Sequence, residues 1–230
     1  MIKDSKVLAL IPARGGSKAI HEKNIYQIMG KPLIEYTIES AKKSKYIDEI
    51  IVSTDSDKIA NISRKCGAKV PFIRPFEIAS DTASTIEVLI HAINELNAQV
   101  KFDCIILLQP TSPLRDENDI DVALEIFIDN GKKSLISVSK VYDNPVLIRR
   151  IHNNQLYKIL NNDSSVRRQD MPEFYKVNGS IYINRICDIH SNTSLNDNVI
   201  PYIMDKSHSV DIDDYSDVCL AEYYIKNKEE

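Results

Sequence analysis

The chain lacks the features that mark membrane, secreted and nucleic-acid-binding proteins. Among its 230 residues, no apolar run approaches the length of a membrane span, and the first residues lack the apolar core of a signal peptide. The four cysteines are far apart and form no Cys-x-x-Cys pair. A net charge of −4 is not the strongly basic balance of a nucleic-acid binder. We therefore expect a cytoplasmic protein with reduced cysteines that binds neither membrane nor nucleic acid.

Several common catalytic motifs are also missing. The sequence contains no Walker A pattern, no Gly-x-Gly-x-x-Gly and no Gly-x-Ser-x-Gly nucleophile turn. Five histidines are present, but none has a partner spacing typical of a general base. We expect His91, which lies among apolar helix residues, to be a packed side chain, and we give His21 only a weak role near substrate.

Length and composition indicate one α/β domain over residues 1–230. Apolar residues make up 43% and charged residues 27%, which is ordinary for a globular protein of this size. Apolar runs at 7–11, 49–53, 68–73, 104–108 and 134–139 alternate with helical patterns. This order predicts parallel strands with helical crossovers, with ligands beyond the carboxyl ends of the strands.

A basic glycine loop follows the first predicted strand. Pro12 ends the apolar run, and Arg14, Gly15, Gly16 and Lys23 come next. Glycines let backbone N–H groups approach a ligand closely, and a concave run of such donors suits phosphate. The two cations could neutralise a polyphosphate. The alternative is a solvated surface loop.

Two further polar segments follow predicted strands. Residues 80–85 open a helix, where they could cap it or bind a base or phosphate. Residues 109–115 contain two prolines and predict a rigid loop at the carboxyl edge of the sheet. Gln109 could pair with a substrate amide, hydroxyl or base edge, and we expect Arg115 to be structural.

The alternation of strand and helix stops at 141–169, where Asn-rich turns separate short runs, so we expect an insertion that protrudes from the sheet. Nearer the end of the chain, Asp211 and Asp213 share a face of an extended segment. Two such carboxylates suit Mg²⁺ that bridges a phosphate. Asp213 or Asp214 could instead cap the last predicted helix.

Five segments, in order through nearly the whole chain, resemble the sugar-activating cytidylyltransferases, in particular the CMP-sialic acid synthetase (acylneuraminate cytidylyltransferase) family. The chain keeps IPARGGSK with KNI, RPFEIASDTAST, LLQPTSPLR, RRQDMP and DID. It departs from the family pattern at Ala19, where glycine is usual, at His21, where proline is usual, and at Lys176, where arginine is common. Lysine keeps the charge but loses the planar fork, which leaves the hydrogen-bond geometry there open.

The resemblance implies a three-layer α/β/α fold with a Rossmann-like, mostly parallel sheet, and a dimerisation subregion at about 140–170. It also implies CMP transfer from CTP to the anomeric hydroxyl of a nine-carbon 2-keto sugar acid, with Mg²⁺ or Mn²⁺ and a homodimer. Implied nucleotide contacts are Ala13, Arg14, Gly15, Lys23, Asn24, Arg74, Ser84 and Thr85. Implied sugar contacts are Gln109, Arg168, Gln169, Lys176 and Asn178. Implied metal ligands are Asp211 and Asp213, and the implied catalytic residues are Arg14, Lys23 and Asp211.

Several alternatives stay open at this point. The acid could be N-acetylneuraminic, legionaminic or pseudaminic acid, and the sequence does not choose among them. It does not choose between Asp211 and a metal-bound water as the proton acceptor, or between one metal and two. A cytidylyltransferase for Kdo or a polyol phosphate fits the GGSK and KNI segments less well. A silent CTP-binding homologue is a further alternative, which Ala19, His21 and Lys176 favour and the retained Arg14, Lys23, Asp211 and Asp213 oppose.

Overall fold

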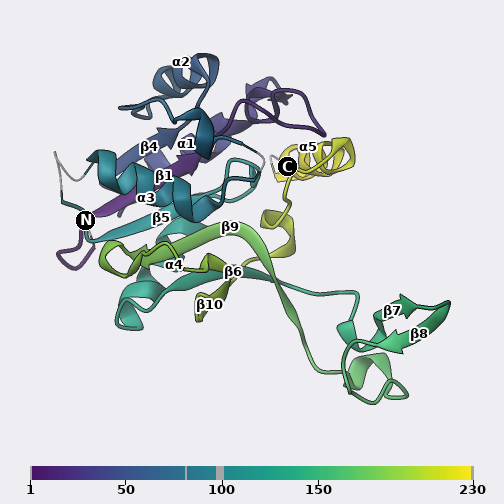
Figure 1. Ribbon diagram of the computed structural model, residues 1–230. Coiled ribbons are helices and arrows are strands. Elements are labelled where there is room, and N and C mark those ends of the chain that lie inside the picture. Colours follow the sequence, from purple (N-terminus) through teal and green to yellow (C-terminus); the bar gives the residue numbers. More distant parts are fainter. Residues whose placement is uncertain (1, 81, 97–100, 229–230) are drawn as a thin grey trace.

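A computed structural model describes residues 2–80, 82–96 and 101–228 (Figure 1). The strands of the central sheet are β1 (Val7–Pro12), β4 (Glu49–Ser53), β5 (Cys104–Leu108), β6 (Leu135–Lys140), β9 (Tyr175–Arg185) and β10 (Ile200–Ile203). The α-helices are α1 (Leu33–Lys43), α2 (Asp57–Cys66), α3 (Thr85–Leu96), α4 (Glu117–Asp129) and α5 (Tyr215–Lys228). Two small ribbons complete the strands: β2 (Gln27–Ile28) with β3 (Lys31–Pro32), and β7 (Arg149–His152) with β8 (Gln155–Lys158).

The central sheet is mostly parallel, as predicted. Its strand order is β10-β6-β9-β5-β1-β4, and only β9 runs antiparallel to its two neighbours, β5 and β6. Because β9 is reversed, its first residues lie at the edge of the sheet where β5 and β6 end. The carboxyl ends of the parallel strands and the start of β9 therefore meet at one edge.

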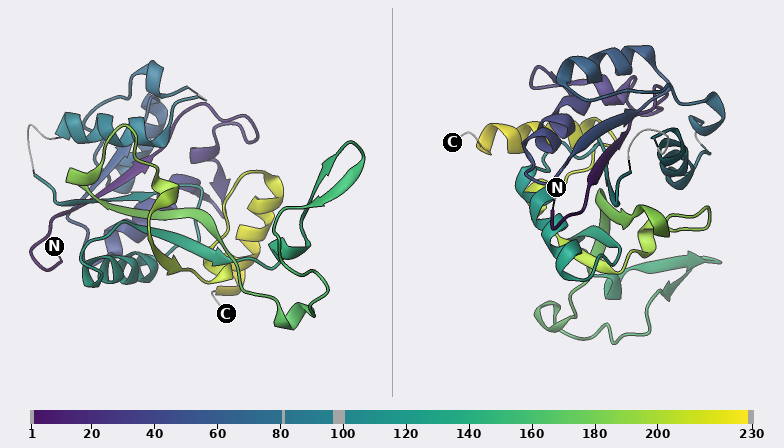
Figure 2. Two further views of the ribbon diagram at one scale, coloured as in Figure 1. Left: turned by 60° about the horizontal axis from the view of Figure 1, so that its bottom comes forward. Right: turned by 90° about the vertical axis from the view of Figure 1, so that its left-hand side faces the viewer.

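Helices cover both faces of the sheet and make three layers (Figure 2). Along β1, Val7, Ala9 and Ile11 pack in one hydrophobic cluster with α1, α2 and α4. Leu8 and Leu10 pack on the other face with α3. This alternation is that of a strand buried on both sides, which explains why the run contains no polar residue. The three-layer α/β/α prediction is confirmed.

Side-chain caps and a glycine set the ends of two helices. The Ser56 side chain accepts a hydrogen bond from the backbone N–H of Ile59 at 3.4 Å and so caps α2. Gly67 ends α2 with φ of 98°, a left-handed conformation that glycine adopts without strain. At α4, Asp116 and Asp119 form a reciprocal capping box.

The predicted strand at 68–73 is wrong. The segment makes only an isolated bridge between Lys69 and Ile51 beside β4. The backbone N–H of Lys69 donates to Ile50 O and Lys69 O accepts from the N–H of Val52, both at 2.9 Å. Pro71 follows two residues later and has no backbone donor, so the pairing does not extend.

The chain between β6 and β9 forms an arm that projects from the body (Figure 1). The arm contains the antiparallel β7–β8 hairpin and a short 3₁₀ helix at Arg168–Asp170. The insertion predicted at 141–169 lies within this arm. Within the described ranges, no helix is long and apolar enough to cross a bilayer.

Candidate active site

The basic glycine loop is fixed to the end of β4 by its backbone. The Ala13 N–H donates to Ser53 O at 2.9 Å, and the Gly15 N–H donates to Asp55 Oδ1 at 2.8 Å. The far side of the loop is held by the Asn24 side chain, whose Nδ2 donates to Arg14 O at 2.9 Å. Ala13 and Gly15 therefore contribute loop geometry rather than side chains.

Arg74 lies under this loop rather than out in solvent. Its side chain is buried, and its guanidinium donates to Ser53 Oγ at 3.1 Å and to Ser53 O. The pKa of Arg74 is lowered to about 10, chiefly by burial; Asp55 opposes this shift, and Arg14 makes a smaller contribution to it. The nearby carboxylate keeps a buried cation charged at neutral pH beside a loop suited to anions.

A cavity of about 310 Å³ opens between this loop, the start of α3 and the loop after β5. It brings together most of the residues predicted at the nucleotide. Those that line it are Arg14, Lys23, Asn24, Arg74 and Thr85, with Gln109 from the predicted sugar contacts. Ala13, Gly15 and Ser84 do not line it.

The polar groups of Ser84 form hydrogen bonds at the start of α3. Its backbone N–H and its hydroxyl donate to Glu87 Oε2 at 2.7 and 2.8 Å, and these bonds lower the pKa of Glu87. Ser84 lines a separate cavity of about 270 Å³ that also includes Thr85, Gln109 and Tyr182. The helix-cap interpretation therefore accounts for its contacts in this structure.

Lys23 connects the glycine loop to the segment before α5. Its Nζ donates to Ile212 O at 2.7 Å and to Asp213 Oδ1 at 3.2 Å. Its backbone N–H is fixed by Ser17 Oγ at 2.9 Å. The ammonium therefore lies where the cavity beside the glycine loop meets the pair of aspartates.

Asp211 and Asp213 share a face, as predicted. Exposure alternates along this segment: Val210 and Ile212 are buried, and the two aspartates between and after them are exposed. Solvent reaches Asp211, yet the surrounding protein desolvates its carboxylate enough to raise its pKa. The negative charge of Asp213 raises it further, and a hydrogen bond from Thr111 and the charge of Lys23 oppose the rise. A carboxylate in such surroundings is stabilised by a cation.

Asp214 is a helix cap, as predicted. Its Oδ1 accepts hydrogen bonds from the backbone N–H and the hydroxyl of Ser216 at 2.7 and 2.5 Å, and these bonds lower its pKa. Asp217 completes the turn, since its Oδ2 accepts from the backbone N–H groups of Asp213 and Asp214 at 2.9 and 3.0 Å.

A second cavity, of about 950 Å³, opens on the other side of Asp211 and Asp213 and includes both. Lys176 is exposed at its edge. Asn178 is buried: its Oδ1 accepts from Ser137 Oγ at 2.6 Å, and its Nδ2 donates to Ser209 Oγ at 3.4 Å. Asn178 thus holds the wall of the cavity together. Two more lysines, Lys140 and Lys206, also line the cavity.

Arg168 and Gln169 do not join the other site residues within one chain. Both are exposed on the arm, where an Arg168 guanidinium nitrogen donates to Tyr142 O at 3.2 Å. Neither residue lines any of the cavities described above.

Arg115 is structural, as predicted. It is almost completely buried, and its guanidinium donates to Gln109 O at 3.1 Å, Ser180 O at 2.9 Å and Thr37 Oγ1 at 2.7 Å. Burial lowers its pKa to about 10, while Asp119 favours the charged form. The loop after β5 is therefore fixed to α1 and β9 by one side chain.

Three residues that shape the site are absent from the predicted set: Asp55, Thr111 and Asp217. Asp55 and Thr111 lie just beyond the carboxyl ends of β4 and β5, which is the position where parallel sheets place ligand contacts. Their position directly after predicted strands therefore marks both residues as candidate site residues in the sequence. Asp217 carries no such signal, because its contacts depend on the turn into α5.

Comparisons with known proteins show which family the chain resembles. A family model described as cytidylyltransferase matches residues 8–229. The chain is 38% identical to the CMP-N,N'-diacetyllegionaminic acid synthase of Legionella pneumophila, over 98% of each chain. It is 35% identical to the N-acylneuraminate cytidylyltransferase of Escherichia coli, over 94% of this chain and 51% of that longer protein.

Among solved structures, a CMP:2-keto-3-deoxy-manno-octonic acid synthetase complexed with CTP superposes with a TM-score of 0.72 at 19% identity, covering 98% of this chain and 99% of that one. At that identity the superposition shows the fold. The family model and the full-length relative go further: this chain belongs to the cytidylyltransferase family that includes the N-acylneuraminate cytidylyltransferases and related CMP-sugar-acid synthases.

Proposed function

We propose that the protein transfers CMP from CTP to the anomeric hydroxyl of a nine-carbon 2-keto sugar acid. The hydroxyl oxygen attacks the α-phosphorus of CTP and loses its proton. A new P–O bond forms, the bond to the β-phosphate breaks, and pyrophosphate leaves. The observation that carries the proposal is the position of Lys23, whose Nζ lies 3.2 Å from Asp213 Oδ1 and lines the basic cavity.

We assign CTP to the cavity beside the glycine loop. Arg14 and Lys23 supply positive charge for the triphosphate, and Arg74, under the loop, adds a fixed cation. Charge that is already in place where negative charge develops lowers the barrier without reorganisation. Thr85 and Gln109 line the same cavity and are suited to orient the nucleoside.

Asp211 and Asp213 would hold Mg²⁺ or Mn²⁺. They fit a hard cation because both are carboxylates on one face, and desolvation, together with the charge of Asp213, raises the pKa of Asp211. When bound, the metal would neutralise phosphate charge during the displacement. Lys23 would orient this segment through its bond to Ile212 O at 2.7 Å.

We assign the sugar acid to the large cavity next to Asp211. Lys176 at its edge carries a charge suited to the substrate carboxylate. Arg168 and Gln169 are assigned to the same carboxylate in a homodimer, where the arm of one chain would reach the site of its partner. N,N'-diacetyllegionaminic acid is the first substrate to test, because the Legionella pneumophila relative is a CMP-N,N'-diacetyllegionaminic acid synthase and matches over 98% of both chains.

The test is pyrophosphate release from CTP and Mg²⁺ with N-acetylneuraminic, N,N'-diacetyllegionaminic, pseudaminic and Kdo acids. Release with a nine-carbon acid supports the proposal and identifies the substrate. Release only with Kdo would contradict the assigned acceptor class. Tight CTP binding without release from any acid would favour the silent homologue.

Lys23→Ala tests the placement of the nucleotide. We expect kcat to fall by roughly 100-fold or more, since a preorganised charge at the leaving phosphates is lost. Lys69→Ala is a suitable control, because Lys69 is exposed and its ammonium pairs with Glu49 at 3.0 Å on the edge of the sheet. Equal rates for both variants would mean that the phosphates do not lie beside Lys23.

A further inference from the structure

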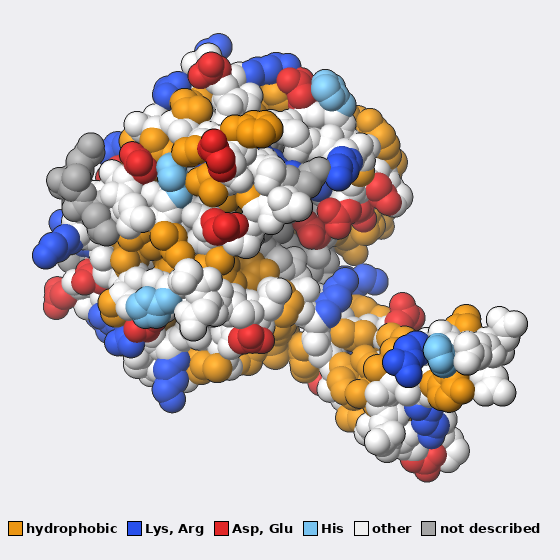
Figure 3. Space-filling model, in the orientation of Figure 1, with side chains coloured by type: hydrophobic (Ala, Val, Ile, Leu, Met, Phe, Trp, Pro, Cys, Tyr) orange, Lys and Arg blue, Asp and Glu red, His pale blue; other side chains and the backbone are white. Residues whose placement is uncertain are grey.

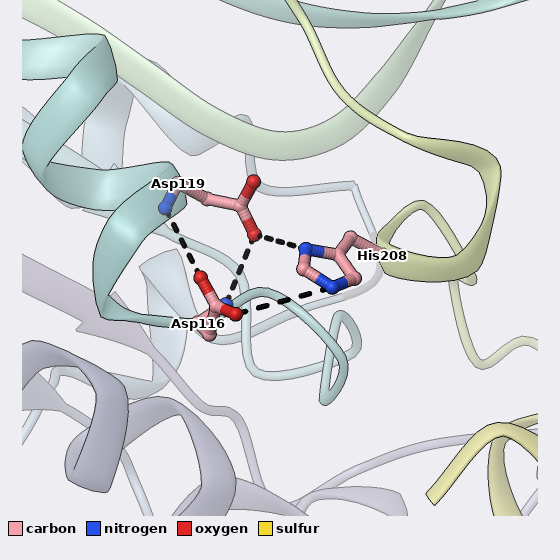
Figure 4. A group of neighbouring side chains, drawn as sticks. All are labelled: Asp116, Asp119 and His208. Atoms are coloured by element: carbon pink, nitrogen blue, oxygen red, sulfur yellow. Dashed lines mark hydrogen bonds and ion pairs between the residues drawn. The ribbon is translucent and has the colours of Figure 1, made fainter. Parts of the chain in front are cut away.

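One cluster of side chains has no role in the proposed reaction: it consists of Asp116, Asp119 and His208 (Figure 4). His208 Nδ1 lies 2.8 Å from Asp119 Oδ2, and His208 Nε2 lies 3.9 Å from Asp116 Oδ2. The other oxygen of Asp119 accepts from Tyr202 OH at 2.8 Å. Asp119 is almost fully buried, while His208 and Asp116 are partly buried.

The three side chains are grouped closely enough to be considered metal ligands, with one atom of each within 4.8 Å of the others. Their existing bonds favour a different role. Asp119 Oδ2 also accepts the Asp116 backbone N–H at 3.0 Å, and Asp116 Oδ1 accepts the N–H groups of Asn118 and Asp119. The carboxylates are thus occupied by the helix cap, by Tyr202 and by the imidazole, which argues for a structural tie.

This tie joins two segments that each lead into the proposed site. Asp116 caps α4 directly after the loop of Gln109 and Thr111. His208 ends the short 3₁₀ helix Lys206–His208, three residues before Asp211. Beyond the cluster the same two segments meet again, because the Ile212 N–H donates to Thr111 O at 2.8 Å.

The chain on either side of His208 is also held. Asp205 Oδ1 accepts from the Ser207 N–H at 2.8 Å, and Ser209 Oγ donates to Asp205 O at 2.6 Å. Ser209 Oγ in turn accepts from Asn178 Nδ2 in β9. The segment from Asp205 to Asp213 is therefore a compact strap, and His208 is its direct bond to α4.

We propose that His208 is a positioning residue, whose bond to Asp119 sets where the strap places Asp211 and Asp213 relative to the loop after β5. The inference rests on the proposed function, in which those two aspartates act at the phosphates. Without the imidazole, Asp119 loses a donor, and the anchors that remain on the strap are the Ile212 N–H bond to Thr111, the bonds from Lys23 to Ile212 O and Asp213, and the bond from Asn178 to Ser209.

The test compares His208→Ala with His208→Asn, because the Asn amide can place a donor near the position of Nδ1. His190→Ala is the matched control, since His190 is an exposed histidine on the loop after β9. The first readout is hydrogen exchange of the Ile212 amide in metal-free protein. The second is the Mg²⁺ concentration that gives half-maximal pyrophosphate release.

We expect exchange at Ile212 to become about tenfold faster in His208→Ala, as for loss of a hydrogen bond to a charged group. The half-saturating Mg²⁺ concentration should rise about tenfold or more, as for loss of a residue that orients ligands. His208→Asn should recover most of both effects, and His190→Ala should match the wild type. Circular dichroism at the assay temperature verifies that each variant is folded.

Wild-type exchange at Ile212 in folded His208→Ala would overturn the inference, and so would faster exchange with an unchanged Mg²⁺ requirement. Failure of the proposed function gives a different result, namely a wild-type protein that releases no pyrophosphate with any acid. The exchange measurement needs neither metal nor substrate, so it tests the tie in either case.

Discussion

At the scale of single residues, Asp211 and Asp214 illustrate how position decides what a carboxylate does. They are three positions apart in the segment before α5, yet the pKa of Asp211 is raised by desolvation and by Asp213, and the pKa of Asp214 is lowered by its bonds to Ser216. The folded protein thus disfavours the charge of one and favours the charge of the other. The first pattern is typical of a functional carboxylate, and the second of a cap.

This difference predicts opposite effects on thermal stability. At neutral pH without metal, Asp211→Asn should raise Tm, because it removes a charge that folding desolvates, and should abolish turnover. This gain should shrink as pH falls through the raised folded pKa of Asp211 and vanish below the unfolded value of about 3.9, where Asp211 is protonated in both states. Thermal melts between pH 4 and 8 measure this, and full activity of the variant would remove Asp211 from the site.

Asp214→Asn is the matched variant, with the opposite sign. A carboxylate whose folded pKa is lowered adds stability above its unfolded pKa, and this contribution is lost as pH falls through the folded pKa. Its Tm should therefore lie below the wild type at pH 7 and approach it in acid. A fall in Tm for Asp211→Asn, equal to that of Asp214→Asn, would contradict the distinction between them.

At the scale of elements, the glycine loop depends on how closely it approaches the start of α2. A Cβ added to Gly15 would lie 3.2 Å from Ser56 Cβ, whereas nothing lies within 4 Å of a Cβ on Gly16. Gly15→Ala should thus cost about 1 kcal/mol or more of unfolding free energy through overpacking. Gly16→Ala should be neutral or slightly stabilising.

Urea denaturation of the two variants checks this expectation, with no ligand present. Similar stabilities would mean that the loop can shift away from Ser56 without loss, and that its bond to Asp55 does not fix it.

The loop after β5 depends on Arg115 in a similar way. Arg115→Met removes the donor of three buried acceptors, on Thr37, Gln109 and Ser180, and should cost about 3 kcal/mol. Arg115→Lys should recover little, because one ammonium cannot span three separated acceptors. Urea midpoints measure both, and a stable Met variant would show that water replaces the guanidinium.

Many of these helices and strands could be predicted from the sequence. Apolar runs locate β1, β4 and β5, and Ser56 and Gly67 mark the ends of α2, because these signals are local. The isolated bridge at Lys69 could not be separated from a strand, since the apolar pattern of 68–73 is the same in both. The position of Arg74 under the loop and the tie from His208 to Asp119 depend on contacts between distant segments, which no spacing reveals.

At the scale of the whole molecule, the arm carries apolar side chains that remain exposed within a single chain (Figure 3). Ile151 is 71% exposed, Leu156 is 69% exposed and Ile159 is 58% exposed, all in or beside the β7–β8 hairpin. Apolar groups gathered in this way favour association. A homodimer is also what would bring Arg168 to a site, because within one chain it lies outside every cavity described.

We therefore expect a dimer in solution that Ile151→Asp with Leu156→Asp converts to a monomer. Light scattering after gel filtration measures the mass. If the partner supplies Arg168, the monomer should bind CTP normally and require more sugar acid. Lys158→Asp on the same hairpin is a control for added negative charge. A wild-type monomer with full activity would contradict the dimer proposal.

Lys140 at the end of β6 and Tyr175 at the start of β9 are paired neighbours in the sheet. In topological terms the whole arm is a long hairpin loop between the antiparallel neighbours β6 and β9, and its two ends are separated by about one strand spacing. Loop length costs little in closure entropy, so the arm can be lengthened, shortened or exchanged without opening the sheet. The fold is thereby modular at this point: if the arm makes the contact between two copies, as we expect, assembly can change while the six-stranded sheet and the glycine loop stay as they are.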